Sequence, residues 1–173
     1  MSLPGFAQRV GFGPKLGVPL RAPYPVGLGD DSLRLTAGGF LDVRLAGPLS
    51  VELNPMWRRI GFDIGREIPS NPFRSSTHIV DLNLLGRLTA SRGRPIQPFI
   101  SGGYVRRFSS NRVSGDFFTL RRLNRWHNGG AIGAGVSFAV GRLRTEPEYR
   151  YANVRKADAG RQGTHDLIVG FRF

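Results

Sequence analysis

The sequence predicts an all-β protein: a closed, eight-stranded, antiparallel up-and-down barrel. Apolar and polar residues alternate repeatedly with the period of two that is typical of strands, and no segment keeps a helical period over three turns. The segments are about ten residues long, which is the length a tilted strand needs to cross a bilayer. Glycine, at 24 residues, and proline, at 12, favour many turns. We therefore predict a transmembrane β-barrel.

The alternation places eight strands in one domain over residues 1–173, near residues 10–20, 36–45, 49–62, 78–88, 96–107, 129–140, 143–154 and 164–173. Short connections, at residues 46–48, 89–95 and 141–142, alternate strictly with long ones at residues 21–35, 63–77, 108–128 and 155–163. Antiparallel strands can be joined by tight turns, so a meander with all its long loops at one end produces this order.

One face of these strands is apolar and the other is charged. The charged face holds acids and bases in nearly equal number: Lys15, Asp42, Arg44, Glu52, Arg58, Asp81, Arg87, Arg144, Glu146, Glu148, Arg150, Asp166 and Arg172. An enclosed charge needs a partner, whereas a charge in water does not. On strand 129–140 the polar side carries small residues such as Gly133 and Gly135, which leave room for long neighbours. We expect this face to line the interior and the apolar face to meet lipid.

Aromatic residues gather near the predicted strand ends, as expected for belts at two membrane interfaces. They are Trp57, Phe62, Phe99, Tyr104, Phe108, Trp126, Tyr149, Tyr151, Phe171 and Phe173. A soluble barrel or sandwich with the apolar face inside is the alternative that fits the same alternation.

The last residues, "HDLIVGFRF", place Leu167, Val169, Phe171 and Phe173 on one strand face. This ending resembles the C-terminal assembly signal of bacterial outer-membrane barrels. The segment "GGAIGAGVSFAVGRLRTEPEYRY", residues 129–151, resembles the penultimate hairpin of small OmpA-like and OmpW-like barrels. The resemblance implies a bacterial outer-membrane location, both ends in the periplasm, and the barrel-assembly machinery as a partner during biogenesis.

The start of the chain lacks the charged and apolar regions of an export signal, so we expect a mature form. We also expect a monomer.

The net charge of +13 comes almost entirely from arginine. One long predicted loop is especially basic and contains Arg106, Arg107, Arg112, Arg121, Arg122 and Arg125. Arginine binds phosphate through paired hydrogen bonds, so we expect this loop to contact lipopolysaccharide, with outer-membrane lipid around the barrel. Basic residues among aromatics are also typical of single-strand nucleic-acid binding on a soluble barrel, which is an alternative; we expect no nucleic-acid partner.

The residues do not predict catalysis. There is no cysteine, no two of His78, His127 and His165 have the spacing of metal ligands on one strand, and the glycines of residues 130–135 lack the order of a dinucleotide fingerprint. We expect no catalytic, cofactor or metal site. An eight-stranded barrel is just wide enough for side chains to fill it. The predicted role is structural or adhesive, and a narrow channel or small-solute transporter is the alternative.

Overall fold

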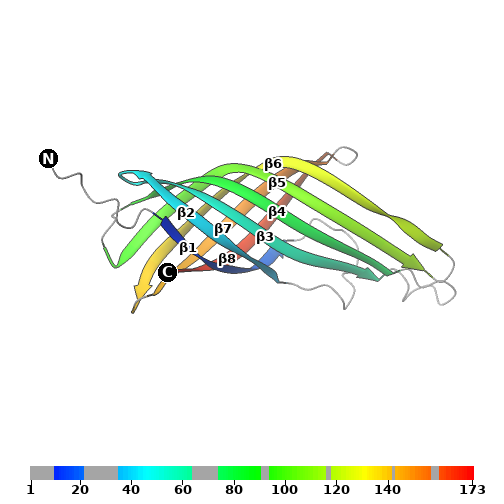
Figure 1. Ribbon diagram of the computed structural model, residues 1–173, viewed down its shortest axis with the longest axis horizontal. Coiled ribbons are helices and arrows are strands. Elements are labelled where there is room, and N and C mark those ends of the chain that lie inside the picture. The colour runs from blue at the N-terminus through cyan, green and yellow to red at the C-terminus, as the bar shows by residue number, and fades with distance from the viewer. Residues whose placement is uncertain are drawn as a thin grey trace.

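Alternating residues build a sheet that closes on itself. The computed structural model describes residues 10–21, 35–63, 74–90, 94–115, 118–141, 143–156 and 160–173. Eight strands follow one another around a closed barrel, each antiparallel to its neighbours, and β8 pairs with β1 (Figure 1). No helix in these ranges is long and apolar enough to cross a membrane. The predicted fold class is confirmed.

The eight strands are β1 Val10–Arg21, β2 Thr36–Ala46, β3 Leu49–Asp63, β4 Arg74–Thr89, β5 Ile96–Gly115, β6 Phe118–Val140, β7 Leu143–Lys156 and β8 Gly160–Arg172. Gly47 and Gly141, with φ of 48° and 64°, lie at two of the three short connections. Left-handed backbone of this kind favours glycine because a side chain would clash there. We call this end of the barrel the turn end and the opposite one the loop end.

Two strands are much longer than the sequence predicted. We expected a loop over residues 108–128, but β5 continues to Gly115 and β6 begins at Phe118, with Phe108 opposite Trp126 and Ser110 opposite Asn124. This expectation is wrong, because the polar residues that marked a loop also suit a hairpin that has left the apolar zone. Figure 1 shows β5 and β6 extending at the loop end.

Closure of the barrel pairs the apolar last strand with the first strand. Leu16 of β1 pairs with Val169 of β8, and the Phe173 amide donates to the Phe12 carbonyl at 3.1 Å. The last strand therefore has neighbours on both sides, and its backbone groups are satisfied without water, as a spanning structure requires.

The apolar face looks outward and the charged face inward. Leu53 is 47% exposed and Ile132 is 65% exposed, whereas the carboxylate residue Glu146 is 1% exposed. A protein in water buries its large apolar side chains and exposes its charges. The reverse arrangement suits a surrounding of lipid, and it contradicts the alternative of a soluble barrel with an apolar core.

Candidate functional site

Charged side chains meet across the lumen of the barrel. Arg87 of β4 donates to Glu146 of β7 at 2.6 Å, although β5 and β6 lie between these strands in the wall. Arg172 of β8 likewise reaches Asp42 of β2 at 2.6 Å. Side chains of strands that do not adjoin can meet only through the interior, so these pairs bridge the lumen.

These two pairs belong to one connected set, which we call the turn-side network. Lys15 bridges two carboxylates, with its Nζ 2.6 Å from Glu52 and 3.1 Å from Glu148. Arg150 also pairs with Glu148, at 2.8 Å. Glu52 also lies 3.4 Å from Arg87, and Arg172 lies 2.9 Å from Glu146. The members are four cations and four anions: Lys15, Arg87, Arg150 and Arg172 with Asp42, Glu52, Glu146 and Glu148.

A second, smaller set lies toward the loop end and is called the loop-side network. Arg58 bonds Asp81 at 2.5 Å and Asp166 at 3.1 Å, while Arg107 donates to Asp81 at 2.6 Å. The network holds two cations and two anions, so each network has equal numbers of both signs. A buried charge without a partner costs several kcal/mol, and neutral sets avoid that cost.

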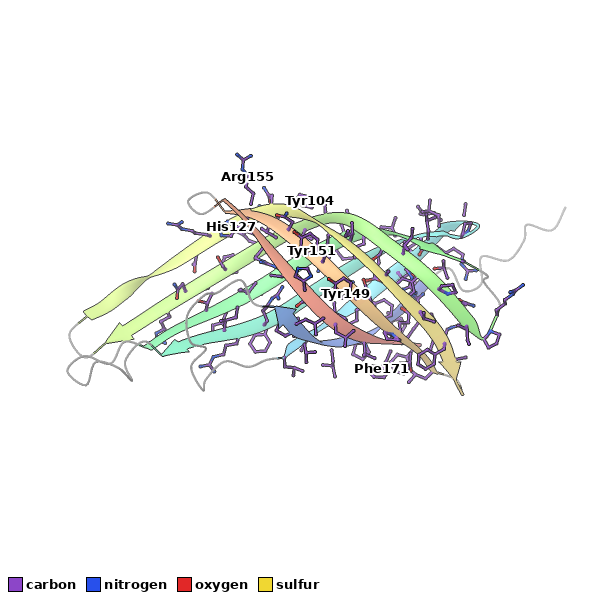
Figure 2. All side chains as sticks on the ribbon, turned by 180° about the vertical axis from the view of Figure 1, so that it is seen from behind. Tyr104, His127, Tyr149, Tyr151, Arg155 and Phe171 are labelled. Atoms are coloured by element: carbon purple, nitrogen blue, oxygen red, sulfur yellow. The ribbon has the colours of Figure 1, made fainter. Side chains whose placement is uncertain are left out.

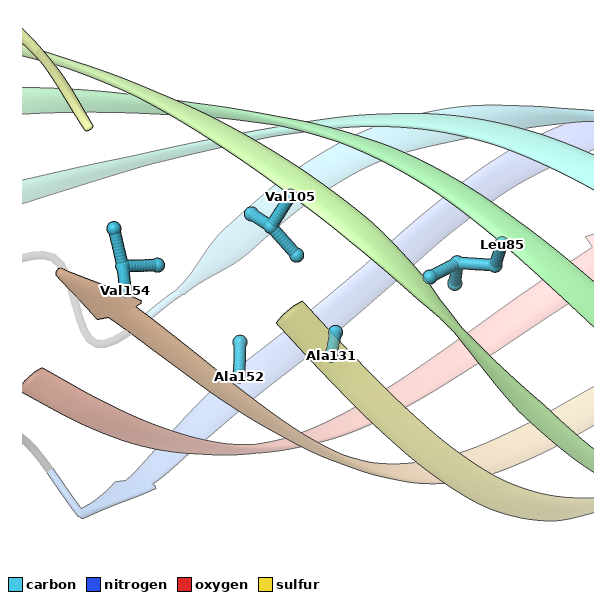
Figure 3. Packing of buried hydrophobic residues seen from close by; sticks show 5 residues of the cluster. All are labelled: Leu85, Val105, Ala131, Ala152 and Val154. Atoms are coloured by element: carbon cyan, nitrogen blue, oxygen red, sulfur yellow. The ribbon is translucent and has the colours of Figure 1, made fainter. Parts of the chain in front are cut away.

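Apolar side chains occupy part of the remaining lumen. Leu85, Val105, Ala131, Ala152 and Val154 form a buried cluster whose side chains turn inward from β4, β5, β6 and β7 (Figure 3). Along β4, Leu85 lies between Arg87 of the turn-side network and Asp81 of the loop-side network.

Small residues on β6 make room for the turn-side network. A Cβ atom at Gly133 would lie 2.5 Å from Glu148 Oε1 and 2.7 Å from Ser101 Oγ. Ser101 itself donates to Glu148 at 3.1 Å. Any larger residue at position 133 would displace the carboxylate that Lys15 and Arg150 bind.

Eleven of the thirteen residues predicted to line the interior lie in the two networks, and two do not. Arg44 is exposed, because it lies next to the turn at Gly47 where the β2–β3 register shifts. Arg144 is half-buried at the turn end and donates to the Arg94 carbonyl at 3.2 Å and to Ser137 at 3.3 Å. The prediction of an interior ion pair is therefore wrong for Arg44, and Arg144 binds neutral acceptors.

Sequence reasoning also assigned two inward-facing residues to the outside. Arg107, predicted for the basic loop, belongs to the loop-side network. Phe99, predicted for an aromatic belt, is buried with the Arg87 guanidinium 3.7 Å from its ring centre. The signal that would have placed them is their position along the strand. Phe99 and Arg107 lie an even number of residues from Val105 on β5, so all three side chains point to the same face.

The remaining residues of the predicted basic loop are distributed over the β5–β6 hairpin. Arg106 lies on the outer wall with its guanidinium 4.6 Å from the ring centre of Trp126, which also packs on Phe108 at 4.9 Å. Arg112 and Arg125 are exposed beyond the apolar band. Arg121 and Arg122 lie in β6, but their side chains are outside the described residues.

The histidines are not brought together. His78 faces outward and stacks on Trp57, and His165 faces outward and contacts Tyr149 at 2.5 Å. His127 is buried inside, with Ser109 Oγ 3.5 Å away. Among the described residues there is no group of three His, Cys, Asp or Glu side chains that could hold a metal ion.

The predicted assembly signal lies on the outer face at the turn end. Leu167 and Phe173 are exposed, Val169 and Phe171 are half-buried, and the Phe173 ring lies 6.3 Å from that of Phe12. These positions leave the stripe open to lipid or a partner. Its role in assembly stays a prediction.

Comparison with solved structures gives the fold a context. The chain is similar to the Neisserial surface protein A, with 14% identity, a TM-score of 0.53 and 94% of each chain covered. It is similar to the N-terminal β-barrel domain of Pseudomonas aeruginosa OprF, with 14% identity and a TM-score of 0.52. The match covers 96% of this chain and 98% of that domain. It also resembles Ail, the attachment invasion locus protein of Yersinia pestis, solved in complex with the heparin analogue sucrose octasulfate. The identity is 17%, the TM-score is 0.53, and the match covers 95% of this chain and 96% of Ail.

No protein-family model matches the chain, and no curated protein sequence gives a match. The identities are too low to transfer a function, but the similarity extends over nearly the whole of each chain. Together with the closed barrel, the apolar wall and the ion pairs across the lumen, it shows that the chain has the fold of the small eight-stranded outer-membrane β-barrels.

Proposed function

We propose that this chain is an integral protein of the outer membrane of a diderm bacterium, with a structural and adhesive role and no catalytic activity. The single observation that carries the proposal is the reversed polarity of the barrel, which has an apolar wall outside and paired charges inside. Only lipid makes that wall favourable, since about 25 cal/mol is lost for each Å² of apolar surface left in water. The turn end would face the periplasm and the loop end the exterior.

The adhesive part of the proposal concerns the β5–β6 hairpin. Arg112 and Arg125 are exposed on strands that continue past the apolar band. Ail, a barrel of similar fold, has been solved with a sulfated heparin analogue, which supports anionic sugars as the class of ligand. Exposed arginines bind sulfate and phosphate through charge-assisted hydrogen bonds.

Membrane insertion is tested by expressing the chain behind an export signal and isolating the outer-membrane fraction. We expect the protein in that fraction, with faster gel migration before boiling than after it, because a closed barrel resists detergent until heated. Protein that stays in the soluble fraction and migrates identically before and after boiling would refute the proposal.

Adhesion and conduction need separate measurements. Binding of the inserted barrel to immobilised heparin should weaken in the variant Arg112→Gln/Arg125→Gln and fall with rising salt. In planar bilayers we expect no steady conductance, because side chains bridge the lumen. Stable single-channel steps would instead favour the narrow-channel alternative.

A further inference from the structure

The outward face of the barrel changes from apolar to polar at a defined level near the loop end. On β5 the outward residues are apolar or glycine over residues 96–104, and the next outward residue is Arg106. On β6 the same holds over residues 130–138, and the next one is Asn128. Each run is about nine residues, close to the length that a tilted strand needs to span the hydrocarbon. These polar residues therefore lie where lipid headgroups begin.

Three polar side chains stand next to one another at this level. Arg106 of β5 is the direct partner of Asn128 of β6, and Asn128 is the direct partner of Arg155 of β7. Directly opposed residues in antiparallel strands have Cβ atoms about 4.5–5.5 Å apart. All three are exposed, and Figure 2 shows Arg155 pointing away from the barrel.

Neighbouring aromatic residues hold two of these side chains in place. Trp126 lies under the Arg106 guanidinium at 4.6 Å and leaves its N–H groups available. The Tyr104 hydroxyl donates to Asn128 Oδ1 at 2.6 Å, so the amide nitrogen of Asn128 is the atom left to donate. The row therefore presents donors to any ligand.

The described part of the protein supplies no negative charge to these arginines. Among the described side chains, neither Arg106 nor Arg155 has a carboxylate within ion-pair distance, and the described acids of the strands face the lumen. Two guanidinium groups flanking an amide donor match a phosphate, whose oxygens accept several hydrogen bonds at once.

We propose that Arg106, Asn128 and Arg155 bind the phosphate of a phosphorylated glycolipid in the outer leaflet. The inference rests on the proposed membrane insertion and assigns lipopolysaccharide contact to the outer wall instead of the hairpin tip. A lipid is favoured over a free anion because the apolar wall starts directly below the row. Ile132 is exposed there, and at Gly130 a Cβ atom would meet nothing closer than the Gly103 oxygen at 3.5 Å. Acyl chains can lie along this wall while the phosphate reaches the arginines.

The test uses the full chain with Trp57→Phe, so that Trp126 is the one tryptophan. The barrel is inserted into phosphatidylcholine bilayers containing either bisphosphorylated lipid A or the same lipid after dephosphorylation, and Trp126 emission is titrated. We expect a saturable change with the phosphorylated lipid alone. Arg155→Gln, which does not contact Trp126, should weaken binding about tenfold, the equivalent of one charge-assisted hydrogen bond of about 1.4 kcal/mol.

Controls separate this site from simple basicity and from misfolding. Native mass spectrometry counts bound lipid A without relying on Trp126 emission. In that measurement Arg106→Gln should lose affinity as Arg155→Gln does, whereas Arg44→Gln at the turn end should bind as the wild type does. Every variant must first show heat-modifiable migration; a wild-type chain that fails this criterion refutes the proposed function. For a barrel that does insert, any of three results would overturn the lipid site alone. These are an Arg155→Gln variant that binds as tightly as the wild type, an equal Trp126 response to both lipids, and displacement of the lipid by millimolar inorganic phosphate.

Discussion

Replacing Arg87 by methionine tests whether the ion pairs across the lumen stabilise the barrel. The guanidinium is buried, lies 2.6 Å from Glu146 and 3.4 Å from Glu52, and stacks on Phe99 at 3.7 Å. Methionine keeps much of the volume but removes the charge. Since four cations then become three against four anions, the turn-side network is left with one excess negative charge.

The expected loss follows from what the remaining partners can do. Removing one member of a buried ion pair costs about 3–5 kcal/mol. In this variant Glu146 still pairs with Arg172 at 2.9 Å and Glu52 still pairs with Lys15 at 2.6 Å, so each carboxylate retains a cationic partner. We therefore expect Arg87→Met to lower the free energy of unfolding by about 3 kcal/mol, near the lower limit of that range.

The measurement is reversible urea unfolding of the refolded full chain in phosphatidylcholine vesicles, followed by tryptophan emission. Glu146→Gln should be similarly destabilising, and the double variant should cost at least about 1 kcal/mol less than the sum of the two, because it restores equal numbers of charges. Arg44→Met, at an exposed position, is the matched control and should leave the midpoint unchanged. Strictly additive losses, or a loss from Arg87→Met no larger than that of the control, would refute the reasoning.

Three other perturbations address the wall, the packing and assembly. Leu53→Arg, in the middle of the apolar outward residues 49–57 of β3, should reduce stability by about 2–4 kcal/mol in the vesicle assay, whereas Leu45→Arg near the turn end should cost about 1 kcal/mol or less. Equal costs would contradict a membrane-spanning wall. Gly133→Leu should destabilise by at least about 1–3 kcal/mol because it displaces a network carboxylate, and Ala134→Leu, facing outward, should not. Removal of Phe173 should slow insertion by the cellular assembly machinery but change the unfolding midpoint of refolded protein little; an equal loss in both assays would make the residue structural.

Much of the architecture could be predicted because strand parity is visible in single residues. Glu146, Glu148 and Arg150 alternate with apolar residues, and all three meet partners inside. Parity gives the face of the sheet on which a side chain lies, but it does not give the height of that side chain along the barrel. Arg44 has the parity of Asp42 yet lies beside the turn, where solvent replaces an ion-pair partner.

The extended hairpin could not be predicted by the same reasoning. Apolar alternation stops where the strands leave the lipid-facing zone, whereas backbone pairing continues, with Ser109 opposite Arg125 and Asn111 opposite Leu123. Hydrogen bonding between backbones does not depend on which side chains are apolar. The partner of Arg107 depends on the register between β4 and β5, which brings Asp81 directly opposite to it, and the alternation within either strand does not reveal that register.

The pairs across the lumen have a consequence for the order of folding. Arg87 and Glu146 lie on β4 and β7, and Arg58 and Asp166 on β3 and β8, so no two-stranded hairpin contains both members of either pair. A hairpin that entered the hydrocarbon alone would lack these partners across the lumen until the distant strands arrived. Insertion and ring closure are therefore expected to occur as one cooperative event, and halves of the chain should fail to insert separately.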